Sequence, residues 1–102
     1  MTQRPFSYDL AAAGQTLTLH GEVDEGASIE LRELLKAITD DLVGELRINL
    51  SDVEFLPSVA IGVLVGARNA AAKNDASVTF VAADGSISRR VLNICGIACE
   101  DD

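Results

Sequence analysis

Segments with the period of a β-strand alternate with segments with the period of an α-helix along most of this 102-residue chain. Apolar and polar residues alternate, as in strands with one buried face, over 6–10, 16–20, 46–50 and 77–82. Apolar residues recur at helical spacing over 29–42, 59–74 and 87–94. The order predicted from these patterns is β-β-α-β-α-β-α.

This order constrains the fold class to α/β. Strands separated by helices need crossover connections, which favour a largely parallel sheet. Only residues 11–15, with Gly14 among them, join the first two strands, so we expect an antiparallel hairpin there. The result is a mixed β-sheet with helices packed on it. The length of the chain suits a single domain over 1–102, with a core over about 6–97. An acidic tail over 98–102 follows, and it is predicted to be disordered from Glu100 on.

Serine residues are predicted to begin the helices. A serine hydroxyl at the N-cap accepts a hydrogen bond from a free N–H group of the first turn. Ser28 and Ser58 stand at the right places for this role, and Ser86 begins the third predicted helical segment. Pro57 has no N–H and disfavours helix at the residue before it, so Ser58 is the best N-cap of the central helix. Before the first helix, residues 22–26 are predicted to form an acidic loop.

The charge balance excludes several partners. The chain carries 16 acidic against 8 basic residues, a formal net charge of −8. A nucleic-acid binder needs clustered Lys and Arg, and only Arg89 and Arg90 are adjacent here. We therefore expect neither nucleic acid nor an anionic membrane as a partner. The longest nearly apolar run, 59–67, is too short to span a membrane, and the N-terminus lacks a secretory signal, so we expect a cytoplasmic protein.

No metal or cofactor site is expected from the sequence. Cys95 and Cys99 have C-x-x-x-C spacing, but the only histidine, His20, is distant in the chain and no second cysteine pair exists. We interpret both cysteines as small apolar residues in a reducing compartment.

No catalytic residues are expected either. A nucleophile needs a base beside it, and Ser58 has only His20, in an unrelated strand, as a conceivable base. Asp52 and Glu54 follow a predicted strand and are interpreted as solvated loop charges, because no burial signal surrounds them. The chain is therefore predicted not to be an enzyme.

The central helix is unusual because its first half has no polar side. The residues that can face the sheet are Ile61, Leu64 and Val65, with Ala71 or Ala72 further on. A second, uncharged face holds Val59, Gly62, Val63, Gly66 and Ala70. A surface helix normally carries a polar stripe there, so a face like this is buried by its own chain or covered by a partner. Little chain remains to bury it, and we favour a partner. The alternative is that Gly62 and Gly66 allow close packing within the domain.

Several segments, taken in order, resemble the STAS domain, a family named for sulfate transporters and anti-sigma factor antagonists. They are the hairpin, the turn 21–24, the strand 46–50, the loop–helix junction 55–64 and the closing stretch 91–97. The nearest type is the free-standing bacterial anti-sigma factor antagonist. The resemblance implies a non-enzymatic regulator that binds an anti-sigma factor, often also a serine kinase, and so releases a sigma factor for transcription.

The loop–helix junction departs from the family's pattern, which usually reads Asp-Ser-Ser/Thr-Gly-Leu. In that family the second hydroxyl residue is phosphorylated, and the phosphate blocks partner binding. Residues 57–61 here read Pro-Ser-Val-Ala-Ile, so Val59 stands at the phosphoacceptor position without an oxygen. We predict that the usual switch is lost there, with Ser58 as the nearest alternative phosphorylation site. The family's final helix has no counterpart, since only five residues follow Ile97; a naturally short chain or a shortened one would account for this.

The predicted partner-binding face combines the acidic loop with the start of the central helix, namely Glu22, Asp24, Ser58, Val59, Gly62, Val63 and Gly66. The favoured partner is an anti-sigma factor/serine kinase. An alternative is a structural STAS subunit of a larger assembly, such as a lipid-transport ABC complex or a signalling scaffold. The sequence also leaves a homodimer as an alternative. A small-ligand or nucleotide binder is less favoured, because nothing matches a Gly-rich phosphate loop.

Overall fold

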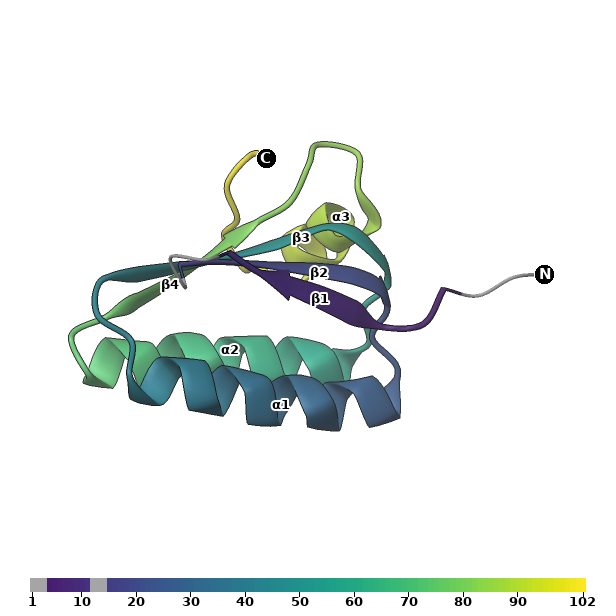
Figure 1. Ribbon diagram of the computed structural model, residues 1–102. Helices are drawn as coiled ribbons and strands as arrows, with labels where there is room; N and C mark the ends of the chain where they lie inside the picture. The colour runs from purple at the N-terminus through teal and green to yellow at the C-terminus, as the bar shows by residue number, and fades with distance from the viewer. Residues whose placement is uncertain (1–3, 12–14) are drawn as a thin grey trace.

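The computed structural model describes residues 4–11 and 15–102, which form a four-stranded sheet and three helices (Figure 1). The elements in chain order are β1 (Ser7–Leu10), β2 (Thr16–Glu22), α1 (Glu25–Asp40), β3 (Glu45–Phe55), α2 (Ser58–Lys73), β4 (Ser77–Val81) and α3 (Ile87–Ile94). This confirms the predicted order and the α/β class. Most of the link predicted between the first two strands, including Gly14, lies outside the described residues.

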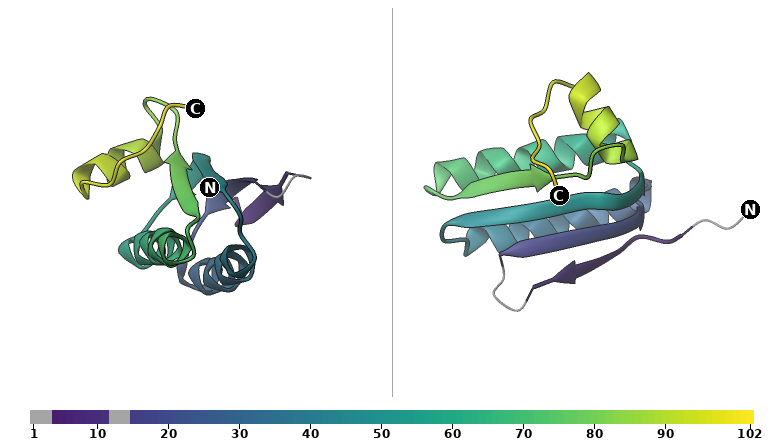
Figure 2. Two further views of the ribbon diagram at one scale, coloured as in Figure 1. Left: turned by 90° about the vertical axis from the view of Figure 1, so that its left-hand side faces the viewer. Right: turned by 90° about the horizontal axis from the view of Figure 1, so that it is seen from above.

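The sheet is mixed, with the strand order β1-β2-β3-β4. β1 pairs antiparallel with β2, whereas β2–β3 and β3–β4 are parallel pairs connected by helices. Both crossovers bring their helices to the same face, so α1 and α2 lie side by side beneath the sheet (Figures 1 and 2). α3 lies apart from this pair, beyond the β4 edge, and packs mainly against β3. Within the described residues, no helix covers the opposite face of β1, β2 and β3 (Figures 1 and 2).

The core lies between the sheet and the α1/α2 pair and is almost entirely aliphatic. Leucine, isoleucine and valine side chains from alternate positions of β2 and β3 are buried there, and Phe80 on β4 is the one fully buried aromatic residue among those described. The buried residues of α2 are Ala60, Val63, Leu64, Ala67 and Ala71. Ile61 and Val65, which were predicted to face the sheet with Leu64, are only half-buried. The buried stripe of α2 is therefore rotated towards smaller side chains than predicted.

α1 begins earlier than predicted. Its N-cap is Asp24, whose carboxylate accepts a 2.8 Å hydrogen bond from the Ala27 N–H. Ser28 is not the cap: it lies inside the helix, buried, and its hydroxyl donates to the Asp24 carbonyl at 2.8 Å. The predicted acidic loop over 22–26 is thus wrong, because Glu22 ends β2 and Glu25 already begins the helix. By contrast, α3 begins where it was predicted, and the structure shows Ser86 as its N-cap, with its hydroxyl accepting from the Arg89 N–H.

The acidic tail is ordered against the sheet, so the prediction of disorder is wrong. The Glu100 N–H donates to the Phe80 carbonyl at 2.8 Å, and the Glu100 carbonyl accepts from the Ala82 N–H at 3.0 Å. These bonds form a parallel bridge between Val81 and Glu100 at the β4 edge. The Glu100 carboxylate also lies 3.0 Å from the Arg47 guanidinium. Pairing with a strand edge and with cations outweighs the acidic composition that suggested a free tail.

Candidate functional site

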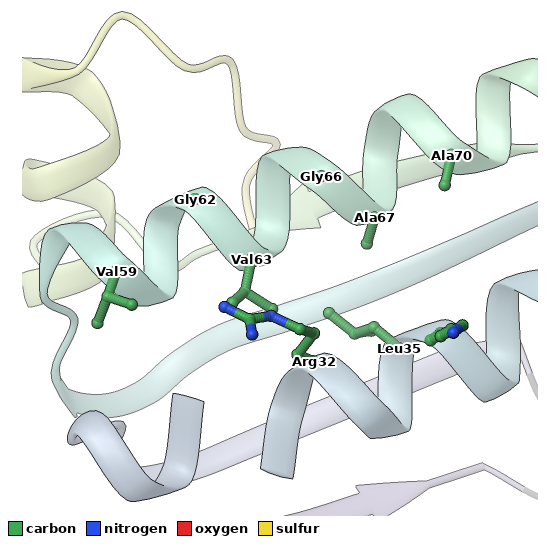
Figure 3. A pocket seen from close by; sticks show the side chains of 9 residues that line it. Arg32, Leu35, Val59, Gly62, Val63, Gly66, Ala67 and Ala70 are labelled. Carbon is green, nitrogen blue, oxygen red and sulfur yellow. The ribbon is translucent and has the colours of Figure 1, made fainter. Parts of the chain in front are cut away.

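A groove of about 500 Å³ runs between α1 and α2 on the helical face of the molecule (Figure 3). Both helices follow parallel strands, so they run side by side in the same direction and their N-termini lie at the same end. α1 contributes Arg32, Leu35 and Lys36, and α2 contributes Val59, Gly62, Val63, Gly66, Ala67 and Ala70. All the α2 residues of this lining are apolar, so one wall of the groove carries no polar side chain.

The structure brings four of the predicted face residues together in this groove, but not in equal roles. Val59 is 43% exposed, which confirms the prediction that it is at least partly accessible. Gly62 and Gly66 are also exposed. Val63 is only 8% exposed and lies on the floor of the groove beside Leu35 (Figure 3), and its part in binding stays a prediction. It is buried because α1 lies beside α2, and this position cannot be read from the α2 sequence.

The two glycines of the groove face open space. A Cβ atom added to Gly62 or Gly66 would meet nothing within 4 Å in the described part of the chain, apart from the glycine's immediate surroundings in its own helix. The alternative that these glycines permit close packing within the domain is therefore wrong for the described residues. Glycine inside a helix costs about 0.5–1 kcal/mol relative to alanine. This cost is not offset by any packing contact inside the described fold.

Ser58 is the first residue of α2 rather than its cap. The N-cap is Pro57, which has extended backbone angles and offers no side-chain capping bond. Ser58 is exposed, and its hydroxyl makes no hydrogen bond to any described residue. The prediction of Ser58 as N-cap is therefore wrong, because Pro57 itself takes the half-helical position. The N–H groups of the first turn of α2 are left without a side-chain acceptor.

The acidic pair of the predicted face, Glu22 and Asp24, lies near this end of the molecule but does not line the groove. Val23, between them, donates its N–H to the Phe55 carbonyl at 3.0 Å, which ties the end of β2 to the end of β3. Glu22 is half-buried opposite Phe55, and the Asp24 carboxylate is occupied at the N-terminus of α1. Both residues flank the beginning of α2, and their part in binding stays a proposal.

A polar cluster on the helix-free face of the sheet was missed by the sequence analysis. The two ring nitrogens of His20 on β2 lie 2.6 Å from Asp52 and 2.9 Å from Asp9. The guanidinium of Arg4 lies 2.9 Å from Asp52 and 2.8 Å from Glu54. Asp52 and Glu54 are therefore exposed but paired residues within β3, and their predicted place in a loop is wrong.

Hydrogen bonds within this cluster shift the pKa values of His20 and Asp52. The hydrogen bond to Asp52, followed by that to Asp9, raises the pKa of His20. The hydrogen bond to His20, followed by that to Arg4, lowers the pKa of Asp52. Each ring nitrogen of His20 faces a carboxylate, one from β3 and one from β1. The cluster thus ties β1, β2 and β3 together.

Two further findings concern the described residues as a whole. No helix within them has both the length and the apolar character needed to cross a membrane. His, Cys, Asp and Glu side chains form no group of three or more that could hold a metal ion in the described ranges. Cys95 is exposed at the end of α3, and Cys99 is half-buried.

The fold and the groove together define the class of protein. Residues 11–100 match the STAS domain family, and the chain belongs to that family. The chain is 35% identical over 82 residues to the anti-sigma-F factor antagonist RsfB of Mycobacterium tuberculosis. That alignment covers 79% of this chain and 65% of RsfB, so the chain matches just under two thirds of its relative's length.

Solved structures agree with this family assignment. An anti-sigma factor antagonist from Mycobacterium paratuberculosis has a TM-score of 0.72 and 26% identity, and the match covers 90% of this chain and 77% of that one. The anti-sigma factor antagonist SpoIIAA in its unphosphorylated form has a TM-score of 0.76 over 96% of this chain and 88% of its own. SpoIIAA is only 16% identical, so this likeness shows the shared fold alone.

Proposed function

We propose that this chain is an anti-sigma factor antagonist that acts in the cytoplasm without catalysis. It binds an anti-sigma factor that is also a serine kinase, and this binding releases a sigma factor for transcription. The names of its relatives support this proposal, since RsfB and the solved mycobacterial protein are both anti-sigma factor antagonists. The binding face is the α2 side of the groove, flanked by Ser58, Glu22 and Asp24.

The observation that carries this proposal is the open space at Gly62 and Gly66. Two glycines in the middle of a helix lower its stability, and no contact in the described chain requires their lack of a side chain. A partner that packs its backbone or side chains directly on α2 does require it. The exposed Val59 at the beginning of the same face adds an apolar contact of the kind found in interface cores.

The second part of the proposal concerns regulation. The position that the family resemblance assigns to the phosphoacceptor is Val59, and valine cannot accept a phosphoryl group. We expect binding to be constitutive and controlled by the abundance of the protein. Ser58 is the competing site, because it is exposed and its hydroxyl makes no hydrogen bond to a described residue. A phosphate there would be favoured by the N–H groups and the dipole of α2.

Binding is tested with a Gly66→Glu variant and the purified anti-sigma factor of the same organism, by isothermal titration calorimetry. Glutamate would place bulk and charge in an apolar contact, so the affinity should fall by about tenfold or more. The unfolding free energy should change by about 1 kcal/mol or less, because the site is on the surface. Ala72→Glu is the matched control, since it adds the same charge to an exposed position on another side of α2. Equal losses in both variants, or unfolding of Gly66→Glu, would contradict the proposed face.

Regulation is tested by incubating the protein with the kinase and ATP and measuring its intact mass. We expect no phosphate to be added. A gain of one phosphate that disappears in Ser58→Ala would overturn constitutive binding and place the switch one residue earlier.

A further inference from the structure

The shape of the α1/α2 groove indicates what kind of segment it can hold. Its lining on α2 runs from Val59 to Ala70, which corresponds to about 16 Å, or three helical turns. The floor is formed by Leu35, Val63 and Ala67, and the open wall at Gly62 and Gly66 lets a bound backbone approach closely. A bound segment of this length would bury most of its apolar side against the two helices.

The backbone chemistry of the groove favours a helix over an extended peptide. The walls are two helices, whose N–H and C=O groups are already bonded along their own axes. An extended peptide pressed into the apolar floor would bury backbone polar groups without partners, which is costly. A helix satisfies its own backbone and offers an apolar stripe to such a groove.

The charged residues of the groove indicate whether the segment that it binds is acidic or basic. Its only two charged lining residues are Arg32 and Lys36, both cationic, in a chain whose net charge is −8. They stand four residues apart on α1, where like charges slightly destabilise a helix. Neither forms an ion pair within the described residues. Arg68, Lys73 and Arg90 form none there either, but they do not line the groove. The carboxylates at the two ends of α1, Glu25 and Asp40, do not line the groove.

From this shape and charge we infer that the groove binds an acidic amphipathic helix of about three turns, supplied by the protein partner. Its apolar stripe lies on Leu35, Val63 and Ala67, and its acidic edge lies against Arg32 and Lys36. The inference rests on the proposed function, because it specifies the segment of the partner that the same face receives. It adds the partner's secondary structure and charge, neither of which the family relationship supplies.

The probes for this inference are two synthetic helical peptides of equal length with the same leucine and alanine stripe. One carries glutamates beside the stripe, and the other carries lysines. Each is titrated into the full ¹⁵N-labelled chain at physiological salt, where charges beyond about 8 Å are screened. The acidic peptide should shift the amide signals of Gly62 and Gly66 and bind about fivefold or more tightly than the basic one. This preference would oppose the net charge of the whole chain, and the shifts at Gly62 and Gly66 would assign it to the groove.

The variant Arg32→Glu/Lys36→Glu should reverse the preference and also weaken binding of the anti-sigma factor. Arg90→Glu on α3 is the control, because it is exposed, has no ion pair among the described residues and lies outside the groove. Circular dichroism establishes that each variant is folded; should the double variant unfold, Arg32→Gln and Lys36→Gln separately must each reduce the preference.

The possible results separate the inference from the proposed function. If Gly66→Glu blocks the anti-sigma factor but the charge reversal does not weaken it, the acidic helix is overturned and the proposed function stands. If the acidic peptide binds as expected but no anti-sigma factor does, the inference stands and the proposed function fails. The inference is overturned if both peptides shift the signals equally or if neither shifts them. It is also overturned if the signals shift with protein concentration alone, which would indicate that a second copy of the chain occupies the groove.

Discussion

The two faces of the sheet differ in whether their charged side chains are paired within the fold. On the helix-free face, His20 is bonded to two carboxylates, Arg4 pairs with Asp52, and the tail brings Asp102 to the Ser51 hydroxyl at 2.8 Å. On the helical face, the cations of the groove have no partner among the described residues, and its glycines face open space. The polar face is thus satisfied internally, whereas the mostly apolar groove retains unused contacts. A surface is available to a partner where its side chains lack contacts within the fold, as in the groove, and not simply where it is charged.

The glycines sharpen this comparison. Gly21 on β2 has φ +80°, and a Cβ there would lie 2.3 Å from the Pro5 carbonyl oxygen. Its missing side chain is required by the fold, because the chain before β1 crosses directly over it. Gly62 and Gly66 have ordinary helical backbones and no such neighbour. The same residue type therefore serves the fold on the sheet and remains available for binding on α2.

The largest effect is expected from Gly21→Ala. A side chain there meets both a left-handed backbone conformation and a backbone oxygen, so the free energy of unfolding should fall by about 1–3 kcal/mol. Urea denaturation followed by circular dichroism measures this change. An unchanged stability would show that the segment before β1 moves away at little cost, and the distinction between the two kinds of glycine would then be lost.

A smaller effect of opposite sign is expected from Gly62→Ala/Gly66→Ala. Alanine fits the open space and favours helix, so each substitution should stabilise the fold by about 0.4–1 kcal/mol. Binding of the anti-sigma factor should weaken at the same time, because the added methyl groups enter the contact. Denaturation and calorimetry on the same sample measure both. A loss of stability would mean that the glycines serve packing within the domain after all.

The smallest effect concerns the pH dependence of stability. The raised pKa of His20 means that its contribution is complete below the ordinary value of 6.5 and is lost as the pH rises through the raised value. The lowered pKa of Asp52 acts at the other end, where its contribution is lost as the pH falls below its ordinary value of 3.8. Stability should therefore decline modestly from pH 6 to pH 9, and His20→Gln should flatten this decline, since His20 is the only histidine. An identical decline in the variant would exclude His20 as its source.

The order of the elements could be predicted because it depends on local patterns. The alternation in β2 and β4 and the helical spacing in α3 each arise within a few residues. The exposure of Val59 was predicted for the same reason, since the uncharged face of α2 is visible along one helix. The cap of α1 was missed because Asp24 and Ser28 are both good N-cap residues and local propensity does not choose between them.

Contacts between segments far apart in the chain determined the features that the sequence analysis missed. The His20–Asp52 contact joins residues 32 positions apart and depends on the register shift between β2 and β3 that sets them opposite each other. The burial of Val63 depends on α1 lying beside α2, and the ordering of Glu100 depends on the free edge of β4. Sequence alone determined which segments are strands and helices and that α2 has an apolar outer side, because periodicity is a local property. Only the tertiary structure decided that this side becomes one wall of a groove with two cations opposite, because which helices become neighbours depends on strand pairing across the whole chain.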